Sequence, residues 1–214
     1  ECLRMLLDKG ANPDMADNFG ATCLAQLANI GEHLDCLGVL LERGANPNIV
    51  SMSGHTALST AAYKGHTGCV RLLVNHGADL NMLGKDGASA LMWAVIYGCY
   101  EIVKILLDGG ADFNYVDKDN GFTALMYAVA NGRQKCTELL LQKGADVRPV
   151  SYRGNSAIML AKNKGYTALV NLLLRYGAVN MNATQSSSMD VSAILAKKFV
   201  ETAASAAFKL VLPF

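Results

Sequence analysis

The chain has 214 residues, of which 51% are apolar, and its 19 basic and 18 acidic residues leave a formal net charge of +1. This balance offers no basic stripe for DNA or RNA and no positive field toward an acidic membrane surface. Because no run approaches the roughly 18 apolar residues of a membrane-spanning helix, we expect the apolar residues to form a core.

The first nine residues suggest a helix, and its end carries a signal that recurs along the chain. Leu6-Leu7-Asp8-Lys9-Gly10-Ala11 is followed by five similar segments. The glycines that mark them lie 34, 33, 33, 34 and 33 residues apart: Gly10, Gly44, Gly77, Gly110, Gly144 and Gly177. A period near 33 predicts a stack of one supersecondary unit.

One complete unit in the middle of the chain shows how each is expected to fold. Residues 84–87 suit a tight turn, and the Ser89 hydroxyl can cap the helix that follows. The run at 90–97 predicts a first helix ended by Gly98, and the apolar spacing at 100–108 predicts a second helix. Two such short helices cannot bury their apolar faces alone, so neighbouring units are expected to stack.

The signature of these units is specific. Residues 55–66 read His-Thr-Ala-Leu-Ser-Thr-Ala-Ala-Tyr-Lys-Gly-His, and 122–126 and 155–159 echo their start. Over about residues 1–180 the chain resembles the ankyrin repeat family. The resemblance implies an all-α solenoid of stacked β-turn and helix–helix units, whose usual role is to bind proteins.

The units depart from the family pattern in two ways. Alanine or cysteine stands where the family has proline at the first helical position, and serine, alanine or methionine replaces its histidine, so we expect lower stability than the idealised pattern gives. Two units also carry an extra residue. We place one near 29–34, between the two helices of its unit, and identify the other as Asn120, in a lengthened turn.

The expected organisation follows from the period. Residues 1–16 are assigned to the second helix and finger start of a truncated first repeat, which suggests a segment of a larger protein. Complete repeats are assigned to 17–50, 51–83, 84–116, 117–150 and 151–183. Residues 184–214 leave the pattern, but Val191, Leu195, Phe199 and Ala203 could form one helical stripe. This tail is interpreted as a degenerate C-terminal helical cap or as an amphipathic segment that docks elsewhere.

Four of the six cysteines occupy one position of the repeat, eight residues before a marking glycine: Cys2, Cys36, Cys69 and Cys136. Ile102 and Leu169 fill that position in the other units, and a buried free cysteine behaves as a small hydrophobe. Stacked units are also too far apart for a disulfide or a shared zinc ion. We therefore expect core packing, no metal, and a reducing compartment, which favours an intracellular, cytoplasmic location.

No combination of residues in the sequence suggests catalysis. The histidines at 33, 55, 66 and 76 fall in different phases of the repeat, without a carboxylate at triad or metal spacing. No nucleophile–base pair is evident. We expect a non-enzyme without a cofactor.

The resemblance implies that a partner peptide or domain binds a concave face formed by turn tips and first helices. We expect a monomeric segment that, given its charge balance, binds no nucleic acid. The residues assigned to it are Met52, His55, Tyr63, Lys85, Asp86, Trp93, Tyr97, Lys118, Asp119, Phe122, Tyr127, Tyr152 and Arg153. The same face would also include Asn18, Phe19, Ser53, Thr60, Lys64, Ile96, Asn131, Asn155, Asn163 and Lys164.

Trp93, the only tryptophan, is expected near Tyr97 and Tyr127, with Tyr63 one unit away. Large aromatic residues with polar tips dominate binding hot spots. In the alternative interpretation, Trp93 and Tyr127 simply pack against a neighbouring turn. The charged tips are expected to form a rim that selects register rather than a basic patch.

Two further interpretations remain open. The family's asparagine hydroxylation pattern matches at Asn81 and Asn114, although each side chain could instead bond the turn backbone. The array could be a scaffold or adaptor that binds another protein. Alternatively, it could be a regulatory or spacer module of a larger enzyme or channel that contacts its own chain.

Overall fold

The computed structural model describes residues 2–85 and 87–178, which belong to a compact unit spanning Glu1–Val179. These residues form eleven helices and no strand. The helices are α1 (Cys2–Asp8), α2 (Cys23–Ile30), α3 (Leu34–Glu42), α4 (Ala57–Lys64), α5 (Thr67–Asn75), α6 (Ala90–Tyr97), α7 (Tyr100–Asp108), α8 (Ala124–Ala130), α9 (Gln134–Gln142), α10 (Ala157–Asn163) and α11 (Thr167–Arg175). The cap or amphipathic tail expected at 184–214 lies outside the described residues, as does Asp86.

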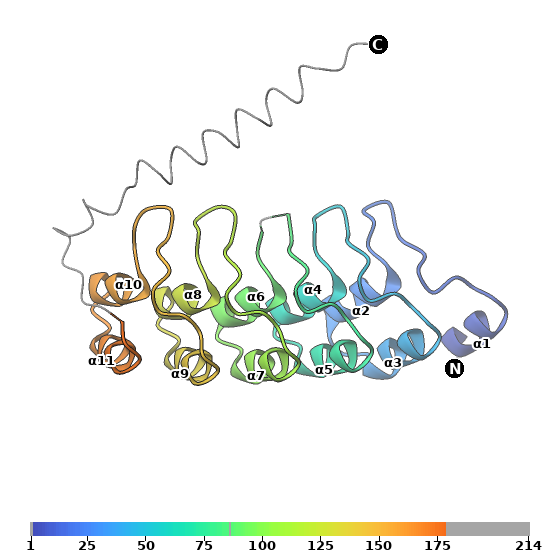
Figure 1. Ribbon diagram of the computed structural model, residues 1–214. Helices are drawn as coiled ribbons and strands as arrows, with labels where there is room; N and C mark the ends of the chain where they lie inside the picture. The colour runs from blue at the N-terminus through green and yellow to red at the C-terminus, as the bar shows by residue number, and fades with distance from the viewer. Residues whose placement is uncertain (1, 86, 179–214) are drawn as a thin grey trace, which may run out of the picture. The chain divides into compact units, whose positions relative to one another are not determined.

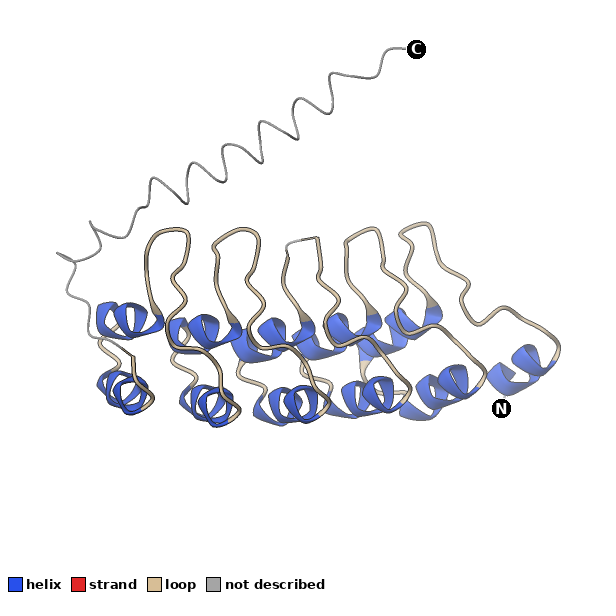
Figure 2. Ribbon diagram, viewed as in Figure 1, coloured by secondary structure: helices blue, strands red, loops and turns tan. Residues whose placement is uncertain are grey.

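Within this unit the helices form two layers (Figure 1). The even-numbered first helices lie side by side in one layer, and the odd-numbered second helices lie in the other. Each first helix packs against the next first helix and against the second helix of its own pair. The long loops, drawn in tan in Figure 2, rise beyond the layer of first helices. The expected all-α stack of helix pairs is therefore confirmed.

Each first helix begins at a hydroxyl residue. The side chains of Thr22, Thr56, Ser89, Thr123 and Ser156 accept hydrogen bonds from the backbone N–H three residues later. These bonds satisfy donors that a helix start leaves without intrahelical partners. Gly98 ends α6 with a φ of 74°, in the left-handed region that favours glycine. The bounds expected for the two helices of this unit, 90–97 and 100–108, are confirmed.

The core is a pair of leucine-rich ladders that run through the stack. In the first helices, one buried position recurs at Leu24, Leu58, Leu91, Leu125 and Ile158. In the second helices, the matching position recurs at Leu40, Leu73, Leu106, Leu140 and Leu173. Because each ladder residue meets its counterparts in the next units, the helix pairs share one continuous core instead of having separate cores.

The cysteines agree with the expected core position except at the first end. Cys69 and Cys136 are as buried as Ile102, whereas Cys36 is half-buried. Cys2 is exposed on α1, so the core prediction is wrong there, because α1 begins the stack and buries none of its residues. All six thiols are free.

Both extra residues lie where the sequence places them. Helix α3 begins eleven residues after α2, from Cys23 to Leu34, whereas α7 begins ten residues after α6. The second insertion lengthens a turn. The Gly121 N–H donates to the Asp117 carbonyl, four residues back, whereas the equivalent bond in the other turns spans three residues, as from Gly54 to Ser51.

Candidate functional site

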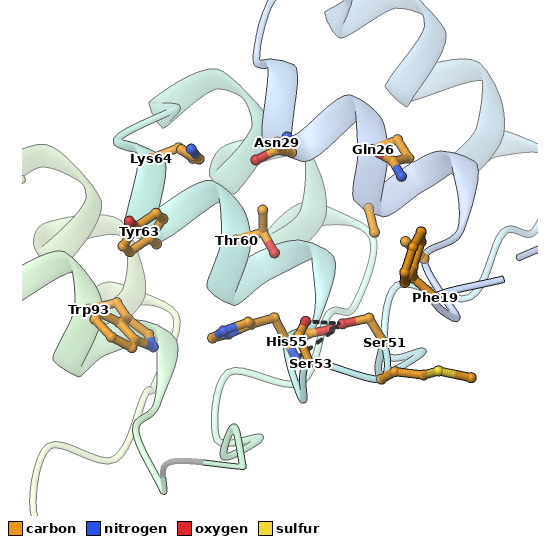
Figure 3. Close-up of a pocket in the computed structure, with 13 residues that line it drawn as sticks. Phe19, Gln26, Asn29, Ser51, Ser53, His55, Thr60, Tyr63, Lys64 and Trp93 are labelled. Atoms are coloured by element: carbon orange, nitrogen blue, oxygen red, sulfur yellow. Dashed lines mark hydrogen bonds between the residues drawn. The ribbon is translucent and has the colours of Figure 1, made fainter. Parts of the chain in front are cut away.

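A hollow of about 640 Å³ lies between three successive units on the face of turn tips and first helices (Figure 3). The turns that begin at Asp17 and Ser51 form one side, and α2, α4 and α6 form the other. It is lined by Phe19, Ala21, Ala25, Gln26, Asn29, Ser51, Met52, Ser53, His55, Thr60, Tyr63, Lys64 and Trp93. Its volume falls within the range of about 300–1,000 Å³ that is usual for ligand pockets.

The spacing within the helices explains why these side chains meet. Residues three apart on a helix point to the same side. The residues four and seven positions after the cap therefore share a face, namely Gln26 and Asn29 on α2, and Thr60 and Tyr63 on α4. Trp93 takes the first of these positions on α6. Stacking the units thus converts one repeated position into a continuous surface.

The hollow presents apolar side chains to solvent. Phe19 is 74% exposed, Met52 64% and Tyr63 40%. Trp93 is half-buried at the far end, where its indole meets the Tyr63 ring edge-on with centroids 5.4 Å apart. Tyr97 stacks on the indole at 6.3 Å and meets Tyr63 at 5.0 Å. These contacts make Trp93, Tyr63 and Tyr97 one aromatic cluster.

The indole of Trp93 has an unusual hydrogen-bonding state. Its Nε1 is buried but has no hydrogen-bond partner among the described residues. The His55 ring lies 6.2 Å from the indole and points toward it in Figure 3. Buried polar groups nearly always have a partner, so this N–H stands out as a donor that the described residues leave unsatisfied.

Tyr127 occupies the same position on α8, but both its ring and its hydroxyl have partners in their own unit. Its ring packs against Phe122 at 5.2 Å, and its hydroxyl donates to the Asp117 carboxylate at 2.9 Å. Burial and this bond to Asp117 raise the pKa of Tyr127 to about 12. The printed ring contacts of Trp93 do not include Tyr127. The interpretation in which the ring packs against a turn therefore fits Tyr127, and that turn belongs to its own unit.

Among the described residues that line the hollow, only Lys64 carries a formal charge, and its ammonium lies 5.4 Å from the centre of the Tyr63 ring. The carboxylate of Asp17, at the start of the turn that carries Phe19, is already occupied. It accepts the backbone N–H groups of Ala21 and Phe19, which lower its pKa, and the side-chain amide of Gln26. At the rim, the Lys85 ammonium donates to the carbonyl of Met52.

The structure brings together only part of the expected set. Met52, His55, Tyr63 and Trp93 line the hollow, and Tyr97 touches two of them. Phe122 and Tyr127 pair in the following unit, whose tip carries the exposed residues Lys118 and Asp119, and the tip of the unit after it carries Tyr152 and Arg153, also exposed. The binding role of all these residues stays a prediction.

The expected set does not contain Gln26 and Asn29, which also line the hollow. Their spacing from Thr22, which equals that of Thr60 and Tyr63 from Thr56, could have identified them.

The two candidate hydroxylation residues have different surroundings. The Asn81 side-chain oxygen accepts the backbone N–H of Asp112 in the next unit, as Asn48 does from Asp79. The alternative interpretation, a bond to backbone, therefore fits Asn81. Asn114 is exposed, and its own N–H donates to the Asp112 carboxylate. Hydroxylation of either residue stays a prediction.

Comparison with known families identifies the architecture. A model described as "Ankyrin repeats (3 copies)" matches residues 47–117, 85–151 and 109–185, and a single "Ankyrin repeat" model matches 19–52. A search of curated proteins found no match. In the described part of the chain, no helix has the length and apolar character needed to cross a membrane. The repeat matches cover most of the sequence and coincide with the stacked helix pairs, and the chain belongs to the ankyrin repeat family.

Proposed function

We propose that this chain is a non-catalytic scaffold or adaptor segment that binds a partner peptide or domain on the face of turn tips and first helices. Ankyrin repeats generally mediate protein–protein interactions. The observation that carries the proposal here is the hollow between Phe19 and Trp93, which leaves aromatic and thioether side chains in water. A monomer gains nothing from such exposure unless another surface covers it.

The chemistry of the hollow favours binding over catalysis. Ser51, Ser53 and His55 lie together there, but the Ser51 hydroxyl bonds Ser53 and the backbone of His55 rather than the imidazole. These bonds shape the turn and leave no activated nucleophile. In contrast, rings with a polar edge are the residues that contribute most to protein interfaces.

The free thiols support an intracellular, cytoplasmic setting as part of the proposal. Cys69 and Cys136 fill core positions as thiols, and burial raises the pKa of each. A raised pKa keeps the thiol protonated and unreactive, as suits a packing residue in a reducing compartment.

The test is a binding measurement on the whole chain. Proteins captured by the chain are identified, purified, and titrated against wild type and Trp93→Ala by calorimetry. We expect the variant to weaken the complex by about 2 kcal/mol or more, because it removes the largest ring that lines the hollow. Tyr176→Ala provides a matched control, since Tyr176 is exposed on the second-helix layer.

Both variants must retain the wild-type urea midpoint, so that a loss of binding is not a loss of fold. If Trp93→Ala left the affinity unchanged, or if Tyr176→Ala reduced it equally, the partner would not dock on this face.

A further inference from the structure

We infer that the hollow recognises an extended acidic peptide, in which an apolar side chain stands beside a carboxylate and a backbone carbonyl reaches the indole N–H of Trp93. This inference rests on the proposed function and specifies the chemistry of the partner. Three observations carry it: an unsatisfied donor, a one-sided charge, and an apolar space of limited size.

The unsatisfied donor results from one residue of the turn. In two other units an aspartate begins the turn and accepts from the side chain four positions after the helix cap, pairing Asp17 with Gln26 and Asp117 with Tyr127. Gly84 begins the corresponding turn before Trp93 and has no side chain to accept. The acceptor that Gln26 and Tyr127 receive from their own turns is therefore missing at Trp93, and a ligand can supply it.

The His55 ring covers the indole N–H of Trp93, but no hydrogen bond among the described residues holds that ring in place. His55 stands against the indole, and its ring has no hydrogen bond in the described part of the chain. Exposed side chains change rotamer within nanoseconds, and His55 is only half-buried. Turning His55 aside would open the indole edge to a carbonyl from the hollow, so no backbone movement is required.

The charge of the residues that line the hollow favours a ligand with a negative charge. Lys64 is the only charged residue among the described residues of the lining, and the Asp17 carboxylate, which lies outside the lining, is occupied by Phe19, Ala21 and Gln26. The Lys85 ammonium at the rim adds positive charge. A carboxylate near Lys64 would therefore meet an attractive field, whereas an ammonium group would meet repulsion.

The apolar part selects the side chain between these polar groups. Phe19 and Met52 stand at one end, and Tyr63 and Trp93 stand at the other. Ala21 and Ala25 have small side chains, which leave room between the two ends. A space of about 640 Å³ suits a short extended segment with an apolar anchor, rather than the surface of a folded domain.

The experiment uses the single indole as its reporter. Because the chain has one tryptophan, its indole N–H gives one resonance in a ¹⁵N-correlated NMR spectrum. Three capped eight-residue probes share a Gly/Ser background. The first carries Leu-Phe between two glutamates, the second replaces both glutamates with lysine, and the third replaces Leu-Phe with Ala-Ala. Affinities are measured in parallel by anisotropy of labelled peptides.

We expect the glutamate peptide to move the indole proton downfield with saturation, because the N–H gains an acceptor. The lysine peptide should bind about tenfold more weakly, and the Ala-Ala peptide should leave the resonance in place. Lys64→Glu should reverse the order of the two charged peptides. Lys164→Glu changes the charge equally at the corresponding position after α10 and should not reverse it. Trp93→Phe keeps a ring but removes the donor and should lower the affinity about fivefold.

The outcomes separate this inference from the proposed function. Equal binding of the glutamate and lysine peptides, both weakened by Trp93→Ala, would overturn the acidic preference while leaving the face a docking site. Binding without movement of the indole resonance, and with Trp93→Phe unchanged, would overturn the carbonyl contact. If no probe bound at about 1 mM, the inference would fail, and calorimetry with the captured partner would still decide the proposed function.

Discussion

Trp93 and Tyr127 occupy the same position in successive repeats, yet the protein treats them differently. Both follow a helix cap by four residues, and both pair a large ring with one polar atom. The Tyr127 hydroxyl donates to Asp117, whereas the Trp93 nitrogen is buried without a partner in the described residues. Equivalent positions in a repeat can therefore differ in whether their polar atom has a hydrogen-bond partner.

The difference lies in the residue that begins each turn. Asp117 accepts the backbone N–H groups of Asp119, Asn120 and Phe122 as well as the hydroxyl of Tyr127, so it joins turn and helix into one network. Gly84 cannot do this for Trp93. Tyr127 is thus held by its own turn, whereas the indole N–H of Trp93 has no such bond and is the donor to which we propose that a partner binds.

Removing Asp117 should have the largest effect, because four donors lose one shared acceptor. Asp117 is only 1% exposed. We expect Asp117→Ala to lower the free energy of unfolding by about 3 kcal/mol, as measured by urea denaturation. Asp119→Ala, at an exposed tip, should change it by less than about 0.5 kcal/mol. Equal losses in the two variants would show that the network adds nothing beyond a surface charge.

Replacing only the hydroxyl isolates the bond that distinguishes the two rings. Tyr127→Phe keeps the contact with Phe122 but removes the bond to Asp117, so stability should fall by about 1 kcal/mol. Tyr97→Phe is the matched control, because Tyr97 is 47% exposed. It should lose clearly less in the same urea titration. A loss at Tyr97 as large as that at Tyr127 would contradict the scaffold role.

The stack itself could be predicted closely from the sequence. Ser89 and Gly98 are strong start and stop signals, so the bounds of α6 followed from local chemistry. The position of Asn120 in a lengthened turn followed from counting between marking glycines. Repeats make such predictions reliable, because the fixed spacing in one unit shows where the elements of the next unit begin and end. The exposure of Cys2 was missed because the repeat pattern treats all units alike, whereas α1 has no first helix of its own unit among the described residues.

The candidate site could be predicted only in part. The sequence identifies Trp93 and Tyr127 as similar aromatic residues on the same face, and treats them as one site. Whether a polar edge finds an acceptor depends on a turn residue nine or ten positions earlier and on how far its side chain reaches. The face expected from the sequence includes Phe19 but not Gln26 and Asn29, which line the hollow with it.

The pH dependence of stability offers another way to sharpen the comparison. The pKa of Tyr127, raised to about 12, lies above the ordinary tyrosine value of 10.0. A group with a raised pKa stabilises the fold fully below its unfolded pKa, and this contribution is lost as pH rises through the folded value. Stability should therefore decline between about pH 10 and pH 12, by less than about 1 kcal/mol after allowance for solvent screening.

Urea midpoints measured across that alkaline range would test this decline. Tyr127→Phe should remove this part of it, because phenylalanine has no proton to lose. The Tyr97→Phe control should keep the Tyr127 contribution. Identical pH profiles for wild type and Tyr127→Phe would mean that the hydroxyl ionises as freely in the folded chain as in the unfolded one.

The smallest expected effect on stability comes from making the two positions alike. Gly84→Asp would place a carboxylate where Asp17 and Asp117 stand in their turns, and Gly84 is not among the glycines with positive φ. The new hydrogen-bond acceptor and the reduced freedom of the unfolded chain both favour the folded state. Because Gly84 is buried, fitting a side chain there offsets part of this gain. We expect a net gain of about 0.5 kcal/mol, seen in urea denaturation.

The indole resonance gives this variant a direct readout. If the carboxylate accepts the indole N–H of Trp93, the resonance of that proton should move downfield without any peptide. The glutamate probe should then bind more weakly, because the N–H that it would bond is already occupied. Gly84→Ala supplies a side chain without an acceptor and should leave the resonance unmoved. Should the aspartate and alanine variants behave alike, the glycine in the turn would not be the reason that Trp93 lacks a partner. Should they differ as expected, one methylene and one carboxylate would convert a binding position into a structural one.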